Sequence, residues 1–233
     1  IPEREDPRDV LVTAEGDALD DLEAGSRVGT NSLRRTLQLR RQRNDLEYAM
    51  LRGNVDTRLR KLAAGEYRAI VLAAAGLRRL NLFGRPLWPI PVEISVPAVG
   101  QGALAIEARA DDARTRALLD KLDHKPSRAC VEAERAFLAV LGGDCHTPVG
   151  GHAQLVEDAK RLRFEGWVGS VDGKEHVRAS QDVWVEDARR LGQLAMDVAK
   201  DVAQTLLERG AAGLIEQAKR EAEAQKRDPR KKI

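Results

Sequence analysis

Residues 10–80 alternate between strand-like and helix-like patterns, and this alternation restricts the chain to a few folds. Short apolar runs such as 69–75 are typical of strands buried on both faces of a parallel sheet. The stretches between them, such as 32–43 and 55–64, carry apolar residues at helical spacing, and Gly65 is a typical helix end. The alternation predicts a wound α/β domain, in which ligands bind at the carboxyl ends of the strands.

Two of the predicted strand-to-helix turns carry arginine. The first is residues 28–35, Val-Gly-Thr-Asn-Ser-Leu-Arg-Arg, and the second is residues 51–58, Leu-Arg-Gly-Asn-Val-Asp-Thr-Arg. A helix N-terminus favours anions, and arginine adds a planar fork of donors that matches a carboxylate or a phosphate. Ordinary N-capping and solvated arginines would explain either turn alone. Together they indicate a site for a small molecule with several negative charges.

The charge balance argues against a general polyanion-binding surface. The chain has 39 Lys and Arg against 37 Asp and Glu, a net charge of +2, and 3% of its residues are aromatic. Nucleic-acid-binding proteins are usually more basic, and those that stack on single strands need more aromatic side chains. Binding of nucleic acid through the arginine-rich stretch 34–43 is a weaker alternative. No apolar run reaches the length of a membrane span, so we expect no membrane partner.

The two cysteines indicate a compartment and a candidate nucleophile. Cys130 and Cys145 do not make a disulfide framework, which favours a reducing cytoplasm. Cys130 lies in a helical pattern, and we expect it in the core. Cys145 follows two glycines and precedes His146 and Pro148, which leaves three interpretations: a half-buried structural cysteine, a Cys–His dyad, or the attachment point of a cofactor. The absence of a Cys-x-x-Cys pair in the sequence disfavours a metal site.

The second half of the chain predicts a small α+β domain with an antiparallel sheet. Four prolines between residues 83 and 97 indicate a crossing between two lobes. We expect a hairpin turn at 171–174 and fraying of the charged stretch from Gln217 onwards. The other predicted elements are a glycine turn and strand over 99–107, helices over 112–122, 127–141 and 187–208, and strands over 153–156, 161–171 and 175–185.

Four segments, taken in order, resemble one family. They are residues 28–35, 51–58, 97–103 and 143–148, and the similarity extends from residue 1 to about residue 215. The chain is identified on these motifs as a member of the porphobilinogen deaminase (hydroxymethylbilane synthase) family. The resemblance implies a transferase of tetrapyrrole biosynthesis. This enzyme deaminates porphobilinogen and joins it head to tail into hydroxymethylbilane on a dipyrromethane cofactor held by a thioether.

The resemblance also implies roles for individual residues. Cys145 matches the cysteine that carries the dipyrromethane cofactor, and the acetate and propionate arms of the pyrroles require cationic partners. The implied cofactor-binding residues are Cys145, Thr30, Asn31, Ser32, Arg34, Arg35, Arg52 and Gly53. The implied substrate-binding residues are Arg58, Arg79 and Gln101, with no metal. The family further implies a cytoplasmic monomer that binds porphobilinogen.

The sequence departs from the family pattern in two ways. Asn31 is often serine in the family, and Asp144 is often glycine. More seriously, the His-Ser-x-Lys-Asp-x-Pro motif, whose aspartate steadies the cationic pyrrole nitrogens, has no counterpart, because Lys200-Asp201 is the only Lys-Asp pair and lacks that context. The chain also starts abruptly at Ile1. We therefore expect an N-terminally truncated fragment that holds no catalytic residue of its own and does not turn over.

The family architecture predicts three parts. Residues 4–96 would form a periplasmic-binding-protein-like wound α/β domain, the family's second domain. Residues 97–120 would be the returning segment of a first domain whose main body is absent, and 121–233 an α+β domain that carries the cofactor cysteine. The predicted strand near 104–108 would then lack sheet partners and expose apolar surface.

One alternative function stays open at this point. A non-enzymatic α/β module could use the two arginine turns to bind a polycarboxylate or a phosphate ligand. Under this alternative Cys145 would be dispensable.

Overall fold

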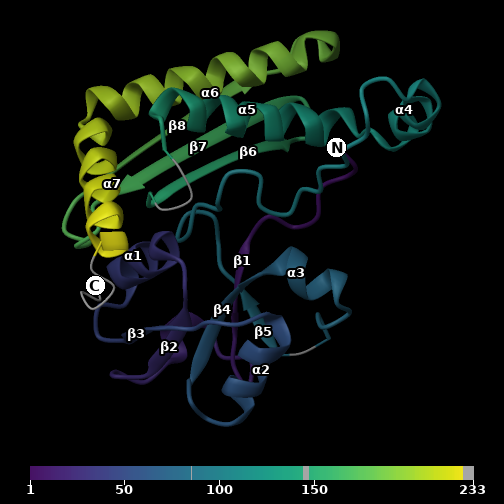
Figure 1. Ribbon diagram of the computed structural model, residues 1–233. Coiled ribbons are helices and arrows are strands. Elements are labelled where there is room, and N and C mark those ends of the chain that lie inside the picture. The colour runs from purple at the N-terminus through teal and green to yellow at the C-terminus, as the bar shows by residue number, and fades with distance from the viewer. Residues whose placement is uncertain (85, 144–146, 228–233) are drawn as a thin grey trace.

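The computed structural model describes residues 1–84, 86–143 and 147–227 and places them in two lobes (Figure 1). The N-terminal lobe contains a five-stranded mixed sheet, and the C-terminal lobe contains a three-stranded antiparallel sheet. This arrangement confirms the predicted fold class. No helix in the described ranges is long and apolar enough to cross a membrane.

The strand order of the N-terminal sheet is β3-β2-β4-β1-β5. Strand β2 runs parallel to β3 and β4, whereas β1 is antiparallel to both of its neighbours, β4 and β5. The sheet is therefore mixed, because the chain enters β1 from the opposite direction to the other central strands. Its strands are β1 (Asp9–Val12), β2 (Arg27–Thr30), β3 (Glu47–Met50), β4 (Ala69–Ala73) and β5 (Leu87–Pro89).

Alternate residues of the central strands fill two cores, one on each face of this sheet. Val10 and Ile70 pack with Leu59 on one face, whereas Leu11 and Val71 pack on the other. The elements between the strands are the 3-10 helix η1 (Leu19–Asp21) and the helices α1 (Leu33–Gln42), α2 (Val55–Ala63) and α3 (Ala74–Arg79).

The first two helices begin at side-chain caps. The Ser32 hydroxyl accepts a hydrogen bond from the backbone N–H of Arg35 at 3.4 Å, and the Asn54 amide oxygen accepts one from Thr57 at 2.9 Å. Helix α2 ends before Gly65, whose φ of +73° confirms the predicted left-handed position. Both helices therefore start directly at the two arginine turns.

Helices α5 (Lys125–Leu141) and α6 (Leu191–Glu208) cover one face of the C-terminal sheet, and α7 (Ala211–Arg227) packs across its end (Figure 1). The sheet consists of β6 (Val149–Val156), β7 (Arg161–Gly169) and β8 (His176–Trp184), with the 3-10 helix η3 (Ala188–Arg190) leading into α6. These elements confirm the predicted antiparallel sheet and its two helices. Helix α7 continues to Arg227, so the predicted fraying from Gln217 is wrong over that range.

The two lobes are joined by apolar packing and by hydrogen bonds around Val96. Leu37 of α1 packs against Val96 and Trp167, which come from the crossing segment and from β7. The Gln38 side chain donates to the Val96 carbonyl at 3.1 Å and accepts from the Val96 N–H at 2.9 Å. Both the backbone and the side chain of Val96 therefore hold the crossing segment against α1.

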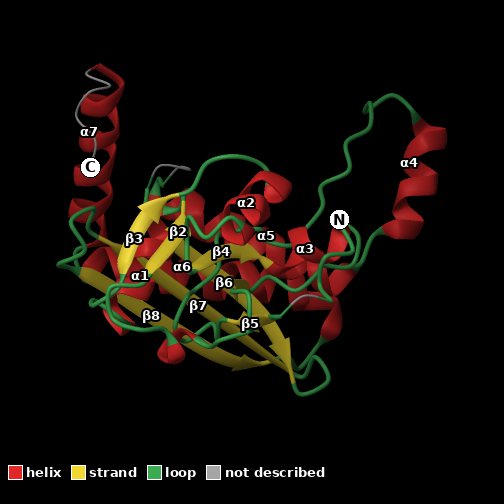
Figure 2. Cartoon of the chain, turned by 90° about the horizontal axis from the view of Figure 1, so that it is seen from below, coloured by secondary structure: helices red, strands yellow, loops and turns green. Residues whose placement is uncertain are grey.

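The predicted strand near 104–108 is not formed. Residues 103–110 lie outside helix and strand, and the side chains of Leu104 and Ile106 are 50% and 47% exposed. Helix α4 (Ala113–Leu119) and the 3-10 helix η2 (Asp120–Leu122) stand out from the body at the end of this segment (Figure 2). The prediction failed because no described strand lies beside the segment to take its hydrogen bonds, whereas the predicted apolar exposure agrees with the structure.

Candidate functional site

A cleft of about 1030 Å³ opens where the two lobes meet. From the N-terminal lobe it is lined by the first arginine turn, by the exposed side of α1 and by the end of β3. From the C-terminal lobe it is lined by parts of α5, β6 and α7. Among the predicted site residues, the cleft lining includes Thr30, Asn31, Ser32, Arg34 and Arg52.

The sheet topology brings the two arginine turns to the same edge. Strands β2 and β3 are parallel neighbours with Thr30 opposite Met50, so their carboxyl ends lie side by side. The N–H of Leu51 donates to the Thr30 carbonyl at 3.2 Å, which continues this pairing into the second turn. The predicted site, in which one ligand contacts both turns at the carboxyl ends of strands, requires this arrangement.

Arg34 and Arg35 share one buried carboxylate, that of Asp9 on β1. Arg34 donates to Asp9 through Nη1 at 2.9 Å and Nη2 at 3.2 Å, and Arg35 donates through Nε at 2.8 Å. Burial alone would raise the pKa of Asp9, but the two guanidinium groups outweigh it and hold the pKa well below its usual range. The Ser95 hydroxyl and the Val96 carbonyl also accept from Nη1 of Arg34, at 3.2 and 2.6 Å.

Gln101 joins this buried network from the segment that connects the lobes. Its side-chain amide donates to Asp9 at 2.9 Å and to the Pro7 carbonyl, and its Oε1 accepts from Arg35 at 3.3 Å. Gln101 and Arg35 do not line the cleft in the part of the chain that the structure describes. Their contact with a ligand therefore stays a prediction.

The second turn is shaped by Gly53. Its φ is +116°, and a Cβ atom at this position would lie 2.7 Å from Cγ2 of Thr57. The Gly53 carbonyl accepts a hydrogen bond from Nε of Arg58 at 2.8 Å, which folds that side chain back over the turn. Arg79 donates to the Gly102 carbonyl at 2.7 Å. The predicted ligand contacts of Gly53, Arg58 and Arg79 stay predictions.

Of the two cysteines, the described residues include Cys130 and not Cys145. Cys145, with Asp144 and His146, lies outside the described residues, whereas Thr147, two positions further on, lines the cleft. Cys130 is buried in α5, as predicted, and burial raises the pKa of its thiol to about 12. Among the described residues, no group of three or more His, Cys, Asp or Glu side chains is placed to hold a metal ion.

Several residues of the site were missed by sequence reasoning. Asp9 carries a signal in retrospect, because a carboxylate at the head of a β-branched run must be buried and paired. Arg40, Tyr48 and Glu221 line the cleft, and nothing in the local sequence sets them apart from solvated surface residues.

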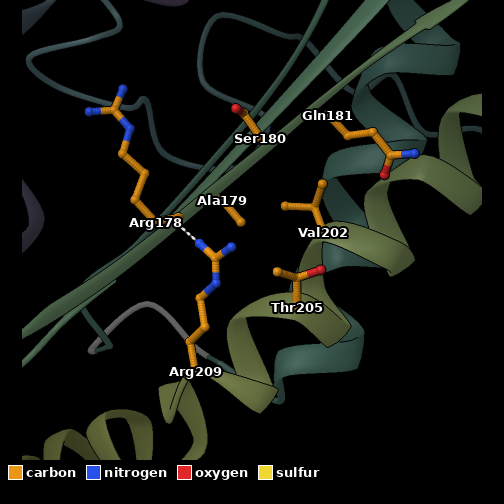
Figure 3. Close-up of a pocket in the computed structure, with 7 residues that line it drawn as sticks. All are labelled: Arg178, Ala179, Ser180, Gln181, Val202, Thr205 and Arg209. Atoms are coloured by element: carbon orange, nitrogen blue, oxygen red, sulfur yellow. Dashed lines mark hydrogen bonds between the residues drawn. The ribbon is translucent and has the colours of Figure 1, made fainter.

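A second depression lies between β8 and the C-terminal end of α6 (Figure 3). Arg209 donates there to the Arg178 carbonyl at 2.7 Å, whereas the Arg178 side chain points away from the depression. Its volume is about 490 Å³, and none of the predicted site residues lines it. The cleft between the lobes is therefore the candidate site.

Fold and cleft together define a two-lobed α/β protein with an arginine-bearing cleft between its lobes. Residues 1–117 match the family model described as "Porphobilinogen deaminase, dipyromethane cofactor binding domain", and residues 128–208 match "Porphobilinogen deaminase, C-terminal domain". The chain belongs to the porphobilinogen deaminase family, which comprises transferases of tetrapyrrole biosynthesis that use porphobilinogen and a dipyrromethane cofactor.

Curated relatives agree with this assignment. A porphobilinogen deaminase of Brevibacillus brevis is 47% identical over 223 residues, which cover 96% of this chain and 69% of the relative. That of Syntrophobacter fumaroxidans is 46% identical over 217 residues, covering 93% and 67% of the two chains. That of Shouchella clausii is 44% identical over 225 residues, covering 96% and 69%.

Proposed function

We propose that this chain serves the deamination of porphobilinogen and its head-to-tail joining into hydroxymethylbilane, and that it holds the dipyrromethane primer of this reaction through Cys145. The observation that carries the proposal is the composition of the cleft. One wall holds the first arginine turn, and the opposite wall holds Thr147, the first described residue after Cys145. A thiol from this loop and arginines from the turn would thus serve the same ligand.

The residues present fit a dipyrromethane with several carboxylates. The cleft volume of about 1030 Å³ lies at the upper end of what small-molecule sites offer, about 300–1000 Å³, so more than one pyrrole ring can enter. Thr30, Asn31 and Ser32 offer neutral hydrogen-bonding groups beside the guanidinium groups of Arg34 and Arg52. This mixture suits an acidic ligand that also carries ring N–H groups.

Each residue has a separate task in this proposal. Cys145 would hold the primer through a thioether: the C–N bond of the aminomethyl group would break, the thiolate would bond to the methylene carbon, and the thiol proton would leave on the released ammonia. When bound, the dipyrromethane supplies a free pyrrole carbon as the nucleophile for the next unit. Arg34 and Arg52 bind carboxylates in the cleft, whereas Arg35 and Gln101 hold Asp9 and with it the position of Arg34.

We further propose that the 233 residues alone do not turn over. Loss of ammonia leaves a cationic pyrrole, which a nearby carboxylate must stabilise. Among the described residues that line the cleft, Glu221 is the single carboxylate, and it accepts a hydrogen bond from Gln217 at 2.9 Å on the surface of α7. Hydroxymethylbilane formation by this chain would contradict the proposal.

The proposal includes the division of the chain and its setting. Residues 4–96 would form the α/β domain, 97–120 a segment that belongs to another domain, and 121–233 the domain that carries the cofactor. The near-neutral charge favours a protein without nucleic-acid partners, and the two cysteines favour a cytoplasmic one. From the family we propose a monomer, and from the lack of a long apolar run no membrane partner.

Intact mass spectrometry tests the attachment of the primer. The chain, a Cys145→Ser variant and a Cys130→Ser variant are each produced with a family-type N-terminal segment that carries the His-Ser-x-Lys-Asp-x-Pro motif. Each is then incubated with porphobilinogen and weighed. We expect a two-pyrrole adduct on the wild type and on Cys130→Ser, and none on Cys145→Ser, because the Cys130 thiol is buried and protonated. A folded wild type that stays unmodified but binds polycarboxylates would favour the non-enzymatic anion-binding module instead.

A further inference from the structure

The arginines of the cleft differ in how far their charge is already neutralised. Arg34 is buried and shares Asp9 with Arg35. Arg40 and Arg52 line the same cleft, are exposed, and form no ion pair with any described carboxylate. The positive charge that a ligand meets first therefore comes from Arg40 and Arg52 as well as from the first turn.

Arg40 is held over an aromatic ring without using up its hydrogen-bond donors. Its guanidinium carbon lies 5.7 Å from the centroid of the Tyr48 ring, and Tyr48 also lines the cleft. The Tyr48 hydroxyl donates to the Arg43 carbonyl at 3.1 Å, which fixes the ring. This cation–π contact favours a position of the guanidinium group over the ring and uses none of its N–H groups, which can therefore donate to a carboxylate.

The neighbouring arginines of α1 do not share this position. Arg41 is exposed but does not line the cleft, and Arg43 is paired with Asp45 at 2.8 Å. Arg40 follows Arg34 by six residues, which corresponds to about 9 Å along a helix axis. One carboxylate cannot reach both side chains easily, whereas a ligand with several carboxylates can contact both.

We propose that Arg40, held over the Tyr48 ring, forms with Arg52 a second carboxylate subsite of the cleft, which binds the acidic side chains of a ligand of several pyrrole rings and not those of a single pyrrole. The inference rests on the proposed function and extends it to the growing chain. It assigns to Arg40 a role in retaining longer intermediates.

Binding measurements with two probes test this subsite. Uroporphyrin I carries acetate and propionate arms on four joined pyrroles, and porphobilinogen carries them on one. Fluorescence titration compares the wild type with Arg40→Gln, Arg40→Lys and Arg41→Gln. Arg41→Gln is the matched control, since it removes the same charge from the adjacent residue outside the cleft.

We expect Arg40→Gln to weaken uroporphyrin I binding about 5–20-fold, the usual effect of one charge-assisted hydrogen bond, and to reduce its dependence on salt. Porphobilinogen binding should change less than about two-fold, and Arg40→Lys should recover part of the loss because it keeps the charge. Arg41→Gln should leave both affinities close to the wild-type values.

Three outcomes would overturn the subsite. In the first, Arg40→Gln and Arg41→Gln weaken uroporphyrin I binding equally, which indicates long-range electrostatics alone. In the second, Arg40→Gln has no effect on uroporphyrin I binding. In the third, inorganic phosphate competes with uroporphyrin I, and this competition itself depends on Arg40. Each leaves the proposed function standing as long as the wild type binds the probes. A folded wild type that binds neither probe would remove the proposed function and the subsite together.

Discussion

At the scale of single residues, the site depends on one carboxylate that serves two guanidinium groups. Asp9 is fully buried, and the Arg34 and Arg35 side chains are 5% and 11% exposed. Two cations and one anion leave a net positive charge in the interior, which Ser95, Gln101 and main-chain carbonyls help to solvate. Such a cluster is costly to break from one side, because the unpaired charges stay buried.

Asp9→Asn should therefore destabilise the protein strongly. We expect a loss of about 3–5 kcal/mol in the free energy of unfolding, since both guanidinium groups lose their counterion. Urea unfolding at pH 7 measures this loss. Asp182→Asn is the control, because it breaks the exposed pair with Arg163, at 2.9 Å, and should cost less than about 1 kcal/mol.

The wild type and Asp9→Asn also test how the contribution of Asp9 to stability changes with pH. The pKa of Asp9 is lower in the folded state than in the unfolded chain, so its contribution is complete above the unfolded pKa of about 3.9. It is lost as the pH falls towards the folded pKa. The stability difference between wild type and Asp9→Asn should thus stay constant from about pH 7 to 5 and shrink below about pH 4. A difference that grows on acidification would contradict the ionised state of Asp9.

At the scale of elements, the C-terminal lobe depends on the close approach of α5 to its sheet. Phe137 of α5 is fully buried and contacts Phe164, with ring centroids 5.1 Å apart. It rests on Gly151 of β6 and Gly166 of β7, where no side chain intervenes. This packing therefore sets the distance between α5, which ends at Leu141, and the sheet.

Gly166→Ala should disturb this packing. The added Cβ would lie 2.6 Å from Cε2 of Phe137 and 3.0 Å from Cδ1 of Leu206, so the helices must shift. We expect a destabilisation of about 1–3 kcal/mol, measured by thermal unfolding. Gly192→Ala in the first turn of α6 is the control, because nothing lies within 4 Å of its Cβ, and it should be neutral or stabilising by less than about 1 kcal/mol. Equal melting temperatures for the two variants would rule out this account of the packing.

At the scale of the whole molecule, the connection between the lobes has an ordered and an extended part. Residues 95–102 are pinned by Gln38, Glu134 and the Asp9 network. Residues 104–111 are exposed, belong to no helix or strand, and lead to α4, which stands away from both lobes (Figure 2). Exposed backbone without regular hydrogen bonds is the preferred substrate of proteases.

Trypsin should therefore divide the chain into two fragments by cutting after Arg109. We expect this cut to be at least about ten-fold faster than any cut after Arg135, because α5 must unfold locally before a protease can act on it. Mass spectrometry of a digestion time course identifies the products. Arg109→Gln should slow the division into these two fragments and move the first cut to Arg114 or Arg116. Early cleavage inside α5 would contradict the described exposure.

Much of the secondary structure was predictable because it follows from local spacing. The period of apolar residues and the glycine at position 65 predicted α1 and α2 correctly, since these signals act within a few residues. The strand near 104–108 was predicted on the same kind of signal and was wrong. A strand also needs a partner, and local spacing carries no information about partners.

The sequence by itself determined the α/β class, the two arginine turns, the family and the candidate attachment residue Cys145. Only the tertiary structure decided how those arginines are used. Asp9 lies 25 residues from Arg34 in the chain, yet it offsets part of the charge of Arg34 in the interior, whereas Arg40, in the same cleft, pairs with no described carboxylate. The physical reason is that charge pairing depends on which groups approach within hydrogen-bond distance after packing, and this is a property of the fold and not of any single segment.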